Sequence, residues 1–335
     1  MSRPYQPARW LRNPHLHTVW GRLVRRPRPV VARQERWETP DDDFVDLLRL
    51  DADDPRAPTF LLLHGLEGTH RSHYIPGTLA LAAARGWQAN LLFFRGCSGE
   101  ENRQRRSYHS GETTDLDFVV RRLAADRPGT PLVLAGVSLG GNVLLKWLGE
   151  RGASLQGVVA AATAISAPYD LARSSRHIDA TASRFYSRRF LRTLRTKALA
   201  KVARFPDLAD EAAVRNARTL WDFDDAFTSV VHGFRDAADY YARSSSIGFL
   251  AGIRVPTLLL SAGDDPFHPP EVLADVARIA RDNAALQPEF VPVGGHVGFV
   301  EGGVPWRTSS YCERRAVEFG AERLAHVALA DPAVG

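Results

Sequence analysis

Short, nearly unbroken apolar runs alternate along the chain with longer segments in which apolar residues recur at helical spacing. Such runs are typical of strands buried on both faces of a parallel sheet. They predict strands at Phe44–Leu50, Thr59–Leu63, Ala89–Phe94, Leu132–Val137, Gly157–Ile165, Pro256–Ser261 and Glu289–Val293. The segments between them predict helices at Tyr74–Arg85, Glu112–Asp126, Leu139–Glu150, Glu271–Asn283 and Ser310–Ala325. This alternation indicates an α/β fold with a mainly parallel central sheet and flanking helices.

One long interval departs from the alternation. Between Pro168 and about Gly252 no strand pattern occurs, and apolar residues recur at near-helical spacing. Examples are Phe190, Leu194, Ala198, Val202 and Phe205. About 85 residues are too many for an ordinary connection between strands. We therefore predict an inserted helical cap over the strand ends.

The patterns divide the chain into three parts. They are an irregular N-terminal segment rich in Pro and Arg (1–40), an α/β core (41–167 and 253–335) and the helical cap (168–252). The 335 residues are 44% hydrophobic and 24% charged, close to the average for soluble globular proteins. These values exclude a mostly disordered, collagen-like or coiled-coil chain.

The sequence gives no sign of export or of a membrane span. No apolar run reaches the ~18 residues that a membrane-spanning helix needs. Residues Met1–Trp20 carry arginines but no apolar stretch behind them, so a secretory signal is not expected. Two cysteines, Cys97 and Cys312, are too few for a disulfide framework. We therefore expect a reducing, cytoplasmic location.

The formal charge of +5 comes mostly from arginine, and no nucleic-acid-reading motif accompanies it, so we expect no nucleic-acid partner. The basic residues concentrate in Arg173–Arg204, where Asp179 is the single acid. Phe185, Phe190 and Leu194 interleave with them. A solvated outer face of the cap is the favoured interpretation, and a weak contact of the cap with an anionic membrane surface stays open as the alternative. No obligate protein partner is indicated.

The candidate nucleophile lies in the run Gly136-Val137-Ser138-Leu139-Gly140, which matches G-x-S-x-G. An apolar strand precedes the run and a helical pattern follows it, as a nucleophile elbow requires. At such a turn the serine is held in a strained backbone conformation, and the flanking glycines let strand and helix approach closely. The context therefore favours Ser138 as a nucleophile over a structural turn.

A serine hydroxyl needs a base, and the base needs an orienting acid. In this architecture the chain order is Ser, then acid, then His. Asp264 and Asp265 follow one predicted strand, and His296 follows the next in a Gly-rich loop. Because a proline usually comes about four residues after the acid, and Pro269 stands four after Asp265, we choose Asp265. The predicted triad is Ser138, Asp265 and His296.

The reaction also needs two backbone N–H groups to hold an oxyanion. One donor is expected from Leu139, the residue after the nucleophile, and the other from a loop after an earlier strand. The run His64-Gly65-Leu66-Glu67-Gly68 follows such a strand, with Leu66 as the donor. Alone this run is equally consistent with a turn that has no chemical role. Beside Ser138 it favours an oxyanion hole.

Together these segments resemble the YheT-like branch of the α/β-hydrolases over nearly the whole chain, from Asn13 to Phe319. Further motifs carry the resemblance: Asn13-Pro14-His15-Leu16, Arg95-Gly96-Cys97-Ser98-Gly99-Glu100, Tyr108-His109-Ser110-Gly111-Glu112-Thr113, Phe223-Asp224-Asp225, His232-Gly233-Phe234 and Asp264-Asp265-Pro266-Phe267. The resemblance implies a serine hydrolase with a helical cap that acts on carboxylic esters.

The leading functional hypothesis is hydrolysis of small-molecule or lipid esters, with apolar acyl chains bound under the cap. Acyl transfer with the same triad is an alternative, and a non-catalytic scaffold is a third. His15 with His17, and His70 with His73, do not form a zinc-ligand pattern, and no nucleotide-binding loop occurs, so neither metal nor cofactor is expected. Phe223, Phe227, Val230, Val231 and Phe234 are candidates for the pocket wall, with packing inside the cap as the equal alternative.

Overall fold

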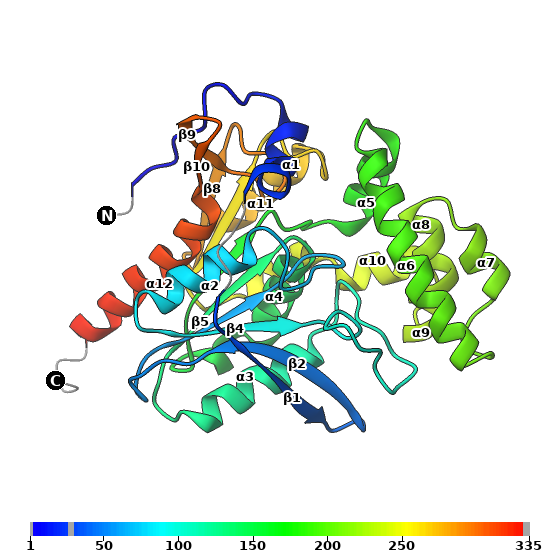
Figure 1. Ribbon diagram of the computed structural model, residues 1–335, viewed down its shortest axis with the longest axis horizontal. Coiled ribbons are helices and arrows are strands. Elements are labelled where there is room, and N and C mark those ends of the chain that lie inside the picture. The colour runs from blue at the N-terminus through cyan, green and yellow to red at the C-terminus, as the bar shows by residue number, and fades with distance from the viewer. Residues whose placement is uncertain (1–2, 26–29, 331–335) are drawn as a thin grey trace.

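Among the described residues, 3–25 and 30–330 of the computed structural model, the central sheet has the strand order β1-β2-β4-β3-β5-β6-β7-β8. β1 is antiparallel to β2 and β2 to β4, and all later neighbours are parallel. Figure 1 shows helices on both sides of this sheet. The strands are β1 (Arg33–Thr39), β2 (Asp43–Leu50), β3 (Thr59–Leu63), β4 (Gln88–Phe93), β5 (Leu132–Val137), β6 (Val159–Ile165), β7 (Thr257–Ala262) and β8 (Leu286–Val291).

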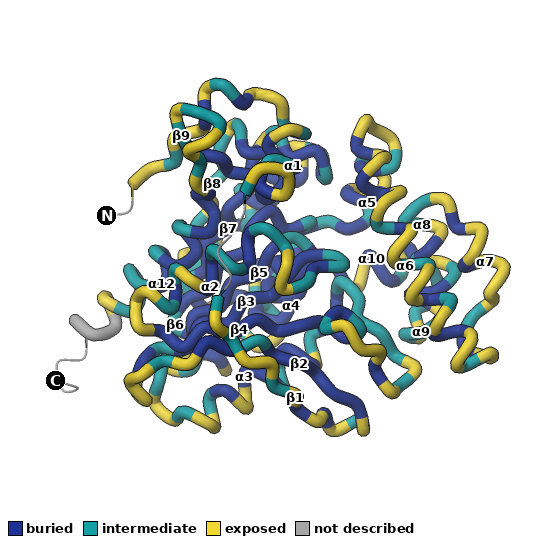
Figure 2. The backbone as a smooth tube through the Cα atoms, viewed as in Figure 1, coloured by how far each residue is buried: buried dark blue, intermediate teal, exposed yellow. Residues whose placement is uncertain are grey.

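Each face of the sheet has its own apolar core. One core includes residues of α3 (Thr114–Asp126), α4 (Leu139–Arg151) and α11 (Glu271–Arg281), and the other includes residues of α2 (Ile75–Ala83) and α12 (Tyr311–Ala330). Successive side chains of a strand point to opposite faces, so central strands must be apolar at every position. Figure 2 shows these strands almost entirely buried. The predicted α/β fold and its mainly parallel sheet are confirmed, and β3 and β5 have the predicted bounds.

The chain between β6 and β7 forms helices. They are α5 (Leu171–Ala180), α6 (Arg184–Arg204), α7 (Glu211–Asn216), α8 (Leu220–Phe223), α9 (Ser229–His232) and α10 (Ala237–Ser244), with a π-helical turn at Asp224–Thr228 and 3-10 turns at Ser246–Gly248 and Leu250–Gly252. A third 3-10 turn, Gly152–Leu155, follows α4 in the core. In Figure 1, α6 to α9 project to one side of the sheet as a separate layer.

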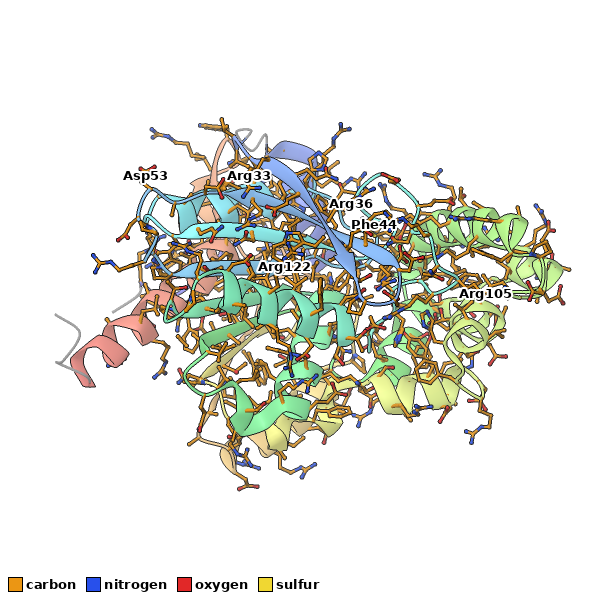
Figure 3. The ribbon with its side chains drawn as sticks, turned by 90° about the horizontal axis from the view of Figure 1, so that it is seen from below. Arg33, Arg36, Phe44, Asp53, Arg105 and Arg122 are labelled. Carbon is orange, nitrogen blue, oxygen red and sulfur yellow. The ribbon has the colours of Figure 1, made fainter. Side chains whose placement is uncertain are left out.

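The N-terminal segment is not irregular, and that prediction is wrong. It contains β1 and a helix, α1 (Pro14–Val24), which Asn13 caps by accepting the N–H groups of His15 and Leu16. The pattern failed at β1 because this edge strand carries charged side chains instead of an apolar run. Arg33 pairs with Asp51, and the Arg36 guanidinium lies 3.6 Å from the centre of the Phe44 ring. Figure 3 labels Arg33, Arg36 and Phe44 on β1 and β2.

A short hairpin, β9 (Val300–Val304) and β10 (Arg307–Ser310), also escaped prediction. It lies beside the N-terminal segment, where the Ala8 N–H donates to the Val300 carbonyl over 3.0 Å. Its strands are short and rich in glycine and serine, so neither shows the alternation that identifies a strand. The N-terminal segment therefore packs on the hairpin that follows the loop of His296.

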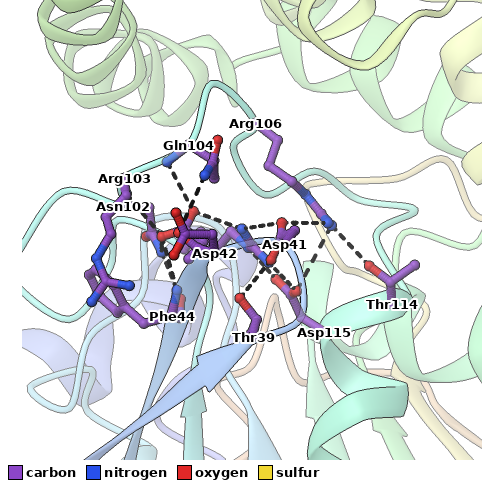
Figure 4. A network of polar contacts seen from close by, with 12 residues as sticks. Thr39, Asp41, Asp42, Phe44, Asn102, Arg103, Gln104, Arg106, Thr114 and Asp115 are labelled. Carbon is purple, nitrogen blue, oxygen red and sulfur yellow. Dashed lines mark hydrogen bonds and ion pairs between the residues drawn. The ribbon is translucent and has the colours of Figure 1, made fainter.

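A buried ionic network fixes the loop after β4. Arg95 donates to Asp115 at 2.7 and 2.8 Å, to Asp43 at 2.7 Å and to Asp41 at 2.9 and 3.1 Å. Figure 4 shows the surrounding contacts, in which the Asn102 amide donates to the Phe44 carbonyl over 2.7 Å. A buried guanidinium needs this degree of pairing because an unpaired buried charge is costly. The network joins the turn before β2, the loop after β4 and the start of α3.

Replacing Arg95 by Leu should lower the free energy of unfolding by roughly 3–5 kcal/mol, because buried carboxylates then lose their cation. Urea denaturation at neutral pH measures the change. Arg103→Leu is the matched control, since its ion pair with Glu38 lies at the surface and should contribute far less to stability. Equal losses for the two variants would contradict this account of the network.

The network also predicts a pH dependence. Burial alone would raise the pKa of Asp41, but hydrogen bonds from Arg95 and Thr39 lower it to about 2. Because this folded-state pKa is depressed, the contribution of Asp41 to stability is present above its ordinary pKa and is lost as the pH falls towards about 2. Arg95→Leu should therefore reduce the loss of stability that accompanies this fall in pH.

Candidate active site

Ser138 occupies the sharp turn between β5 and α4 with φ 54° and ψ −121°, a conformation that a non-glycine residue rarely adopts. A Cβ atom at Gly136 would lie 2.4 Å from the Gly140 carbonyl oxygen, and one at Gly140 would lie 2.5 Å from the His64 carbonyl oxygen. Both positions therefore require glycine. The close approach of strand, helix and neighbouring loop projects Ser138 from the carboxyl end of the sheet.

The three predicted triad side chains lie together. His296 Nε2 is 2.9 Å from Ser138 Oγ, and His296 Nδ1 is 2.9 Å from Asp265 Oδ2. Burial alone would raise the Asp265 pKa, but the charges of His296 and His268 and their hydrogen bonds outweigh burial and hold it well below its ordinary range. Asp265 is therefore ionised and fixes the imidazole with Nε2 directed at the serine.

The neighbouring Asp264 has a different partner. Its Oδ1 accepts the backbone N–H groups of Gly294 and Gly295 at 2.8 and 2.9 Å. It thus shapes the loop that carries His296, while Asp265 contacts the imidazole itself. Of the two aspartates, the one with the proline spacing, Asp265, makes the imidazole contact.

A second histidine, His268, lies on the far side of Asp265, and sequence reasoning did not single it out. Its Nε2 is 3.4 Å from Asp265 Oδ2, and both residues are buried. Burial lowers the His268 pKa, but the Asp265 charge and hydrogen bond outweigh it, so the net shift is upward. The carboxylate of Asp265 therefore lies between two imidazoles.

The two predicted oxyanion donors lie at the same site. Gly65 N–H donates to the Tyr74 hydroxyl and Glu67 N–H to the Tyr108 hydroxyl, which pins the backbone on either side of Leu66. Within the described part of the chain, the N–H groups of Leu66 and Leu139 have no hydrogen-bond acceptor. Both residues line one cavity with Ser138 and His296.

His64 positions this loop and takes no part in a triad. Its Nε2 accepts the Phe94 N–H at 3.1 Å, so Nδ1 carries the proton and donates to the Gly65 carbonyl at 2.7 Å. Burial lowers its pKa to about 4, which keeps the ring neutral. His64 thus ties the loop that carries Leu66 to the end of β4.

Helix α1 supports the loop that carries His296 from outside. Thr18 Oγ1 accepts the His296 backbone N–H at 2.9 Å, and a Cβ at Gly298 would lie 2.3 Å from the His17 carbonyl oxygen. The Phe267 ring stacks on the imidazole at 3.9 Å between ring centres and 10° between planes. Sequence reasoning missed the roles of Thr18 and Phe267. The available signals were the motifs around Asn13 and Asp265, which gave no spatial relation to His296.

A cavity of about 190 Å³ opens beside Ser138 under the helices between β6 and β7. An engineered apolar cavity of ~150 Å³ binds benzene, so this space suits an apolar group larger than a few waters. Apolar side chains from α5, α6 and α8 and from the π-helical turn line it: Leu171, Ile178, Phe190, Leu194, Leu220, Phe223 and Phe227.

The candidate wall residues divide between the two predicted roles. Phe223 and Phe227 line the cavity and also pack inside the helical layer. Val230 is exposed, Val231 packs with the helical layer and Phe234 packs against Tyr240, so these three do not line the cavity. Val231 and Phe234 thus follow the packing alternative, and Val230 follows neither, because helical spacing alone does not distinguish an inward face from a neighbouring-helix contact.

Polar groups also face the cavity. Burial raises the pKa of Asp224 to about 6, although hydrogen bonds from Thr228 and Tyr241 favour its ionised form. Burial lowers the pKa of His109 to about 4 and that of His232 to about 3. Both imidazoles are therefore neutral near pH 7.

Cys97 is a buried free thiol near Lys197, whose Nζ lies 3.6 Å from its Sγ. Burial raises the Cys97 pKa to about 11, so it is not a thiolate at neutral pH. His15 contacts Tyr186, and His73 packs against α1 at Gly21. Over residues 3–25 and 30–330, no group of three or more His, Cys, Asp or Glu side chains has the geometry to hold a metal ion.

Comparison with known proteins identifies relatives over most of the chain. The family model described as alpha/beta hydrolase fold matches residues 58–303. YheT of Escherichia coli (strain K12) is 38% identical, covering 90% of this chain and 88% of that protein. Phospholipase ABHD3 of Mus musculus is 30% identical, covering 97% of this chain and 80% of that protein. Monoacylglycerol lipase of Saccharomyces cerevisiae is 29% identical, covering 84% and 62%.

Solved structures share the fold at low sequence identity. The Pyrococcus furiosus esterase Pf2001 is similar with a TM-score of 0.57 at 16% identity, covering 90% of this chain and 97% of that one. Est1E from Butyrivibrio proteoclasticus, in a complex with ferulic acid, has a TM-score of 0.56 at 13% identity, covering 87% and 99%. In the described parts of this chain, no helix has the length and apolar character to cross a membrane.

Replacing Thr18 by Val should lower kcat roughly 10- to 100-fold on an ester substrate with little change in KM. The substitution removes the acceptor of the His296 N–H and leaves the cavity intact. Steady-state kinetics measures both constants. Thr18→Ser is the matched control, because it keeps the hydroxyl and should restore kcat. Loss in both variants together with a lower melting temperature would mean that Thr18 only stabilises the fold.

Proposed function

Because this chain belongs to the alpha/beta hydrolase family, we propose that it hydrolyses carboxylic esters through an acyl-enzyme on Ser138. One observation carries the proposal. Two hydrogen-bond distances of 2.9 Å link Ser138, His296 and Asp265 beside a largely apolar cavity. A scaffold without catalytic activity would have no need for a strained serine aligned with an oriented imidazole.

In the proposed reaction, Ser138 Oγ attacks the ester carbonyl carbon while His296 Nε2 takes its proton. The carbonyl oxygen becomes an oxyanion, which the N–H groups of Leu66 and Leu139 stabilise. When the tetrahedral intermediate collapses, the bond to the alcohol oxygen breaks and His296 gives that oxygen the proton. A water molecule then repeats the sequence on the acyl-enzyme, releasing the acid and Ser138.

Asp265 stays ionised throughout and stabilises the imidazolium that forms in each half-reaction. Its depressed pKa means that it does not compete for the proton that moves between Ser138 and substrate. Phe267 and Thr18 keep the imidazole ring and its backbone in place. The reaction needs no cofactor in this scheme.

The proposed substrates are small-molecule or lipid esters with an apolar acyl chain. The apolar cavity beside Ser138 supports this class, and relatives include proteins named phospholipase and monoacylglycerol lipase. Acyl transfer would use the same residues, and new esters formed on adding alcohols would reveal it. We propose the cytoplasm as the location, since Cys97 and Cys312 are both free and buried.

Ser138→Ala should lower kcat by about 10⁴ or more and abolish labelling by a fluorophosphonate probe. The matched control is Ser174→Ala, since Ser174 lines the same cavity on α5 but takes no part in the triad. Hydrolysis of p-nitrophenyl esters and mass spectrometry of the labelled protein give the two readouts. Full activity in a folded Ser138→Ala protein would rule out the proposed nucleophile.

Phe227→Ala should lower kcat/KM for long-chain esters relative to acetate by roughly tenfold, because it removes part of the cavity wall. Phe234→Ala is the control of equal chemistry, since Phe234 packs outside the cavity. A series of p-nitrophenyl esters of graded chain length measures the preference. If Phe227→Ala fails to fold, Phe190→Ala tests the same wall from a half-buried position. Unchanged preference in both wall variants would contradict an acyl-binding role.

A further inference from the structure

Helix α6 uses its cations in two different ways along its length. In its C-terminal half, Lys197 pairs with Glu67 at 2.9 Å, and Lys201 donates to the Gln104 and Arg106 carbonyls at 2.9 and 2.7 Å. These contacts tie the helical layer to the core loops. The basic charge of this half is therefore satisfied within the protein.

The N-terminal half of α6 is different. Arg184, Arg188, Arg189 and Arg192 are exposed, and none of them has a carboxylate partner among the described residues. Their spacing places them on one face of the helix, together with Phe185. The opposite face carries Tyr186, Phe190 and Leu194, which face the core and the cavity.

Helix α1 extends this surface with apolar residues. His15 lies against α6, with ring-centre distances of 6.0 Å to Phe185 and 5.9 Å to Tyr186. Leu16 and Leu23, two turns apart on α1, are 48% and 70% exposed, and Phe185 is 51% exposed. Figure 2 shows exposed positions along both helices. We call these residues, with Arg22 and the four α6 arginines, the α1–α6 patch.

The arginines of the patch lie close enough to repel one another. Partial desolvation and then the charges of Arg22 and Arg192 lower the pKa of Arg189. The whole chain carries a formal charge of +5, so no surplus of acidic groups elsewhere offsets this local concentration. An anionic surface would relieve the repulsion.

We propose that the α1–α6 patch docks this protein onto lipid bilayers that contain anionic lipids. Arginines on a helix beside exposed Leu and Phe side chains match such a surface, which binds the guanidinium groups by charge and buries the apolar groups between headgroups. A nucleic acid would satisfy the arginines but would give Leu16, Leu23 and Phe185 no apolar environment. The combination of arginines without carboxylate partners and exposed apolar side chains in the patch therefore favours a lipid surface.

The patch adjoins the candidate active site through an unbroken row of aromatic rings. Ring centres are 3.8 Å apart for Phe185 and Tyr186, 4.8 Å for Tyr186 and Phe267, and 3.9 Å for Phe267 and His296. A docked protein would therefore have its cavity wall at the lipid surface. That docking brings the candidate active site to lipid esters rests on the proposed ester hydrolysis. The binding to bilayers itself does not rest on it.

Binding is tested with the full chain carrying Ser138→Ala, so that vesicles stay intact. Flotation with phosphatidylcholine vesicles, with or without phosphatidylserine, measures the bound fraction. We expect binding only when phosphatidylserine is present, and weaker binding as the salt concentration rises. The triple variant R188Q/R189Q/R192Q should lose at least roughly tenfold in apparent affinity.

Two matched variants separate the patch from overall charge and from electrostatics alone. R56Q/R85Q/R281Q removes the same charge from exposed positions outside the patch and should bind as the parent does. L16S/F185S keeps every arginine and should still lose affinity. Equal loss in both triple variants, or no loss in R188Q/R189Q/R192Q, would overturn the proposal. Binding to a DNA duplex that depends on the patch, without binding to either vesicle, would assign it to nucleic acid instead.

The two proposals fail separately. If the Ser138→Ala protein binds anionic vesicles but the wild-type chain hydrolyses no ester, docking stands and the proposed function is wrong. If the wild-type chain hydrolyses soluble esters but shows no vesicle binding, the proposed function stands and the docking surface is wrong.

Discussion

The structure depends on a close approach of three backbones that only glycine permits. At Gly136 and Gly140, strand β5, helix α4 and the loop after β3 come within distances that leave no room for a Cβ atom. This packing forces Ser138 into its positive-φ turn and places Leu139 at the cavity. It also holds the Leu66 loop beside the serine. The candidate nucleophile and the candidate oxyanion donors are thus positioned by one packing constraint.

The central sheet and the order of the candidate triad could be predicted because both leave local signals. β3 and β5 are mostly apolar and buried at every position, and the Ser-Asp-His order follows from residues that come after strands. β1 could not be found in the same way, because its edge position permits Arg33 and Arg36. Thr18 and His268 act through contacts in space, which spacing along the chain does not encode. The choice between Asp264 and Asp265 was possible only because Pro269 gave an indirect marker of loop geometry.

Helix α6 illustrates why a count of charges does not define a surface. The sequence places ten cations on Arg173–Arg204 without separating them. The structure separates them: Lys197 and Lys201 hold the helical layer onto the core, while the arginines near its start face outward. The periodicity of apolar residues predicts the helix. Only the contacts in the structure show which of its cations already have partners.

The bond from His296 to Thr18 has a consequence for how the protein is made. The two residues are 278 positions apart, and a ribosome adding roughly 5–20 residues per second needs on the order of 15–55 s to span that interval. During this time α1 lacks the loop against which it packs. The nascent chain therefore holds the strained Ser138 turn without its His296 partner until position 296 has been added.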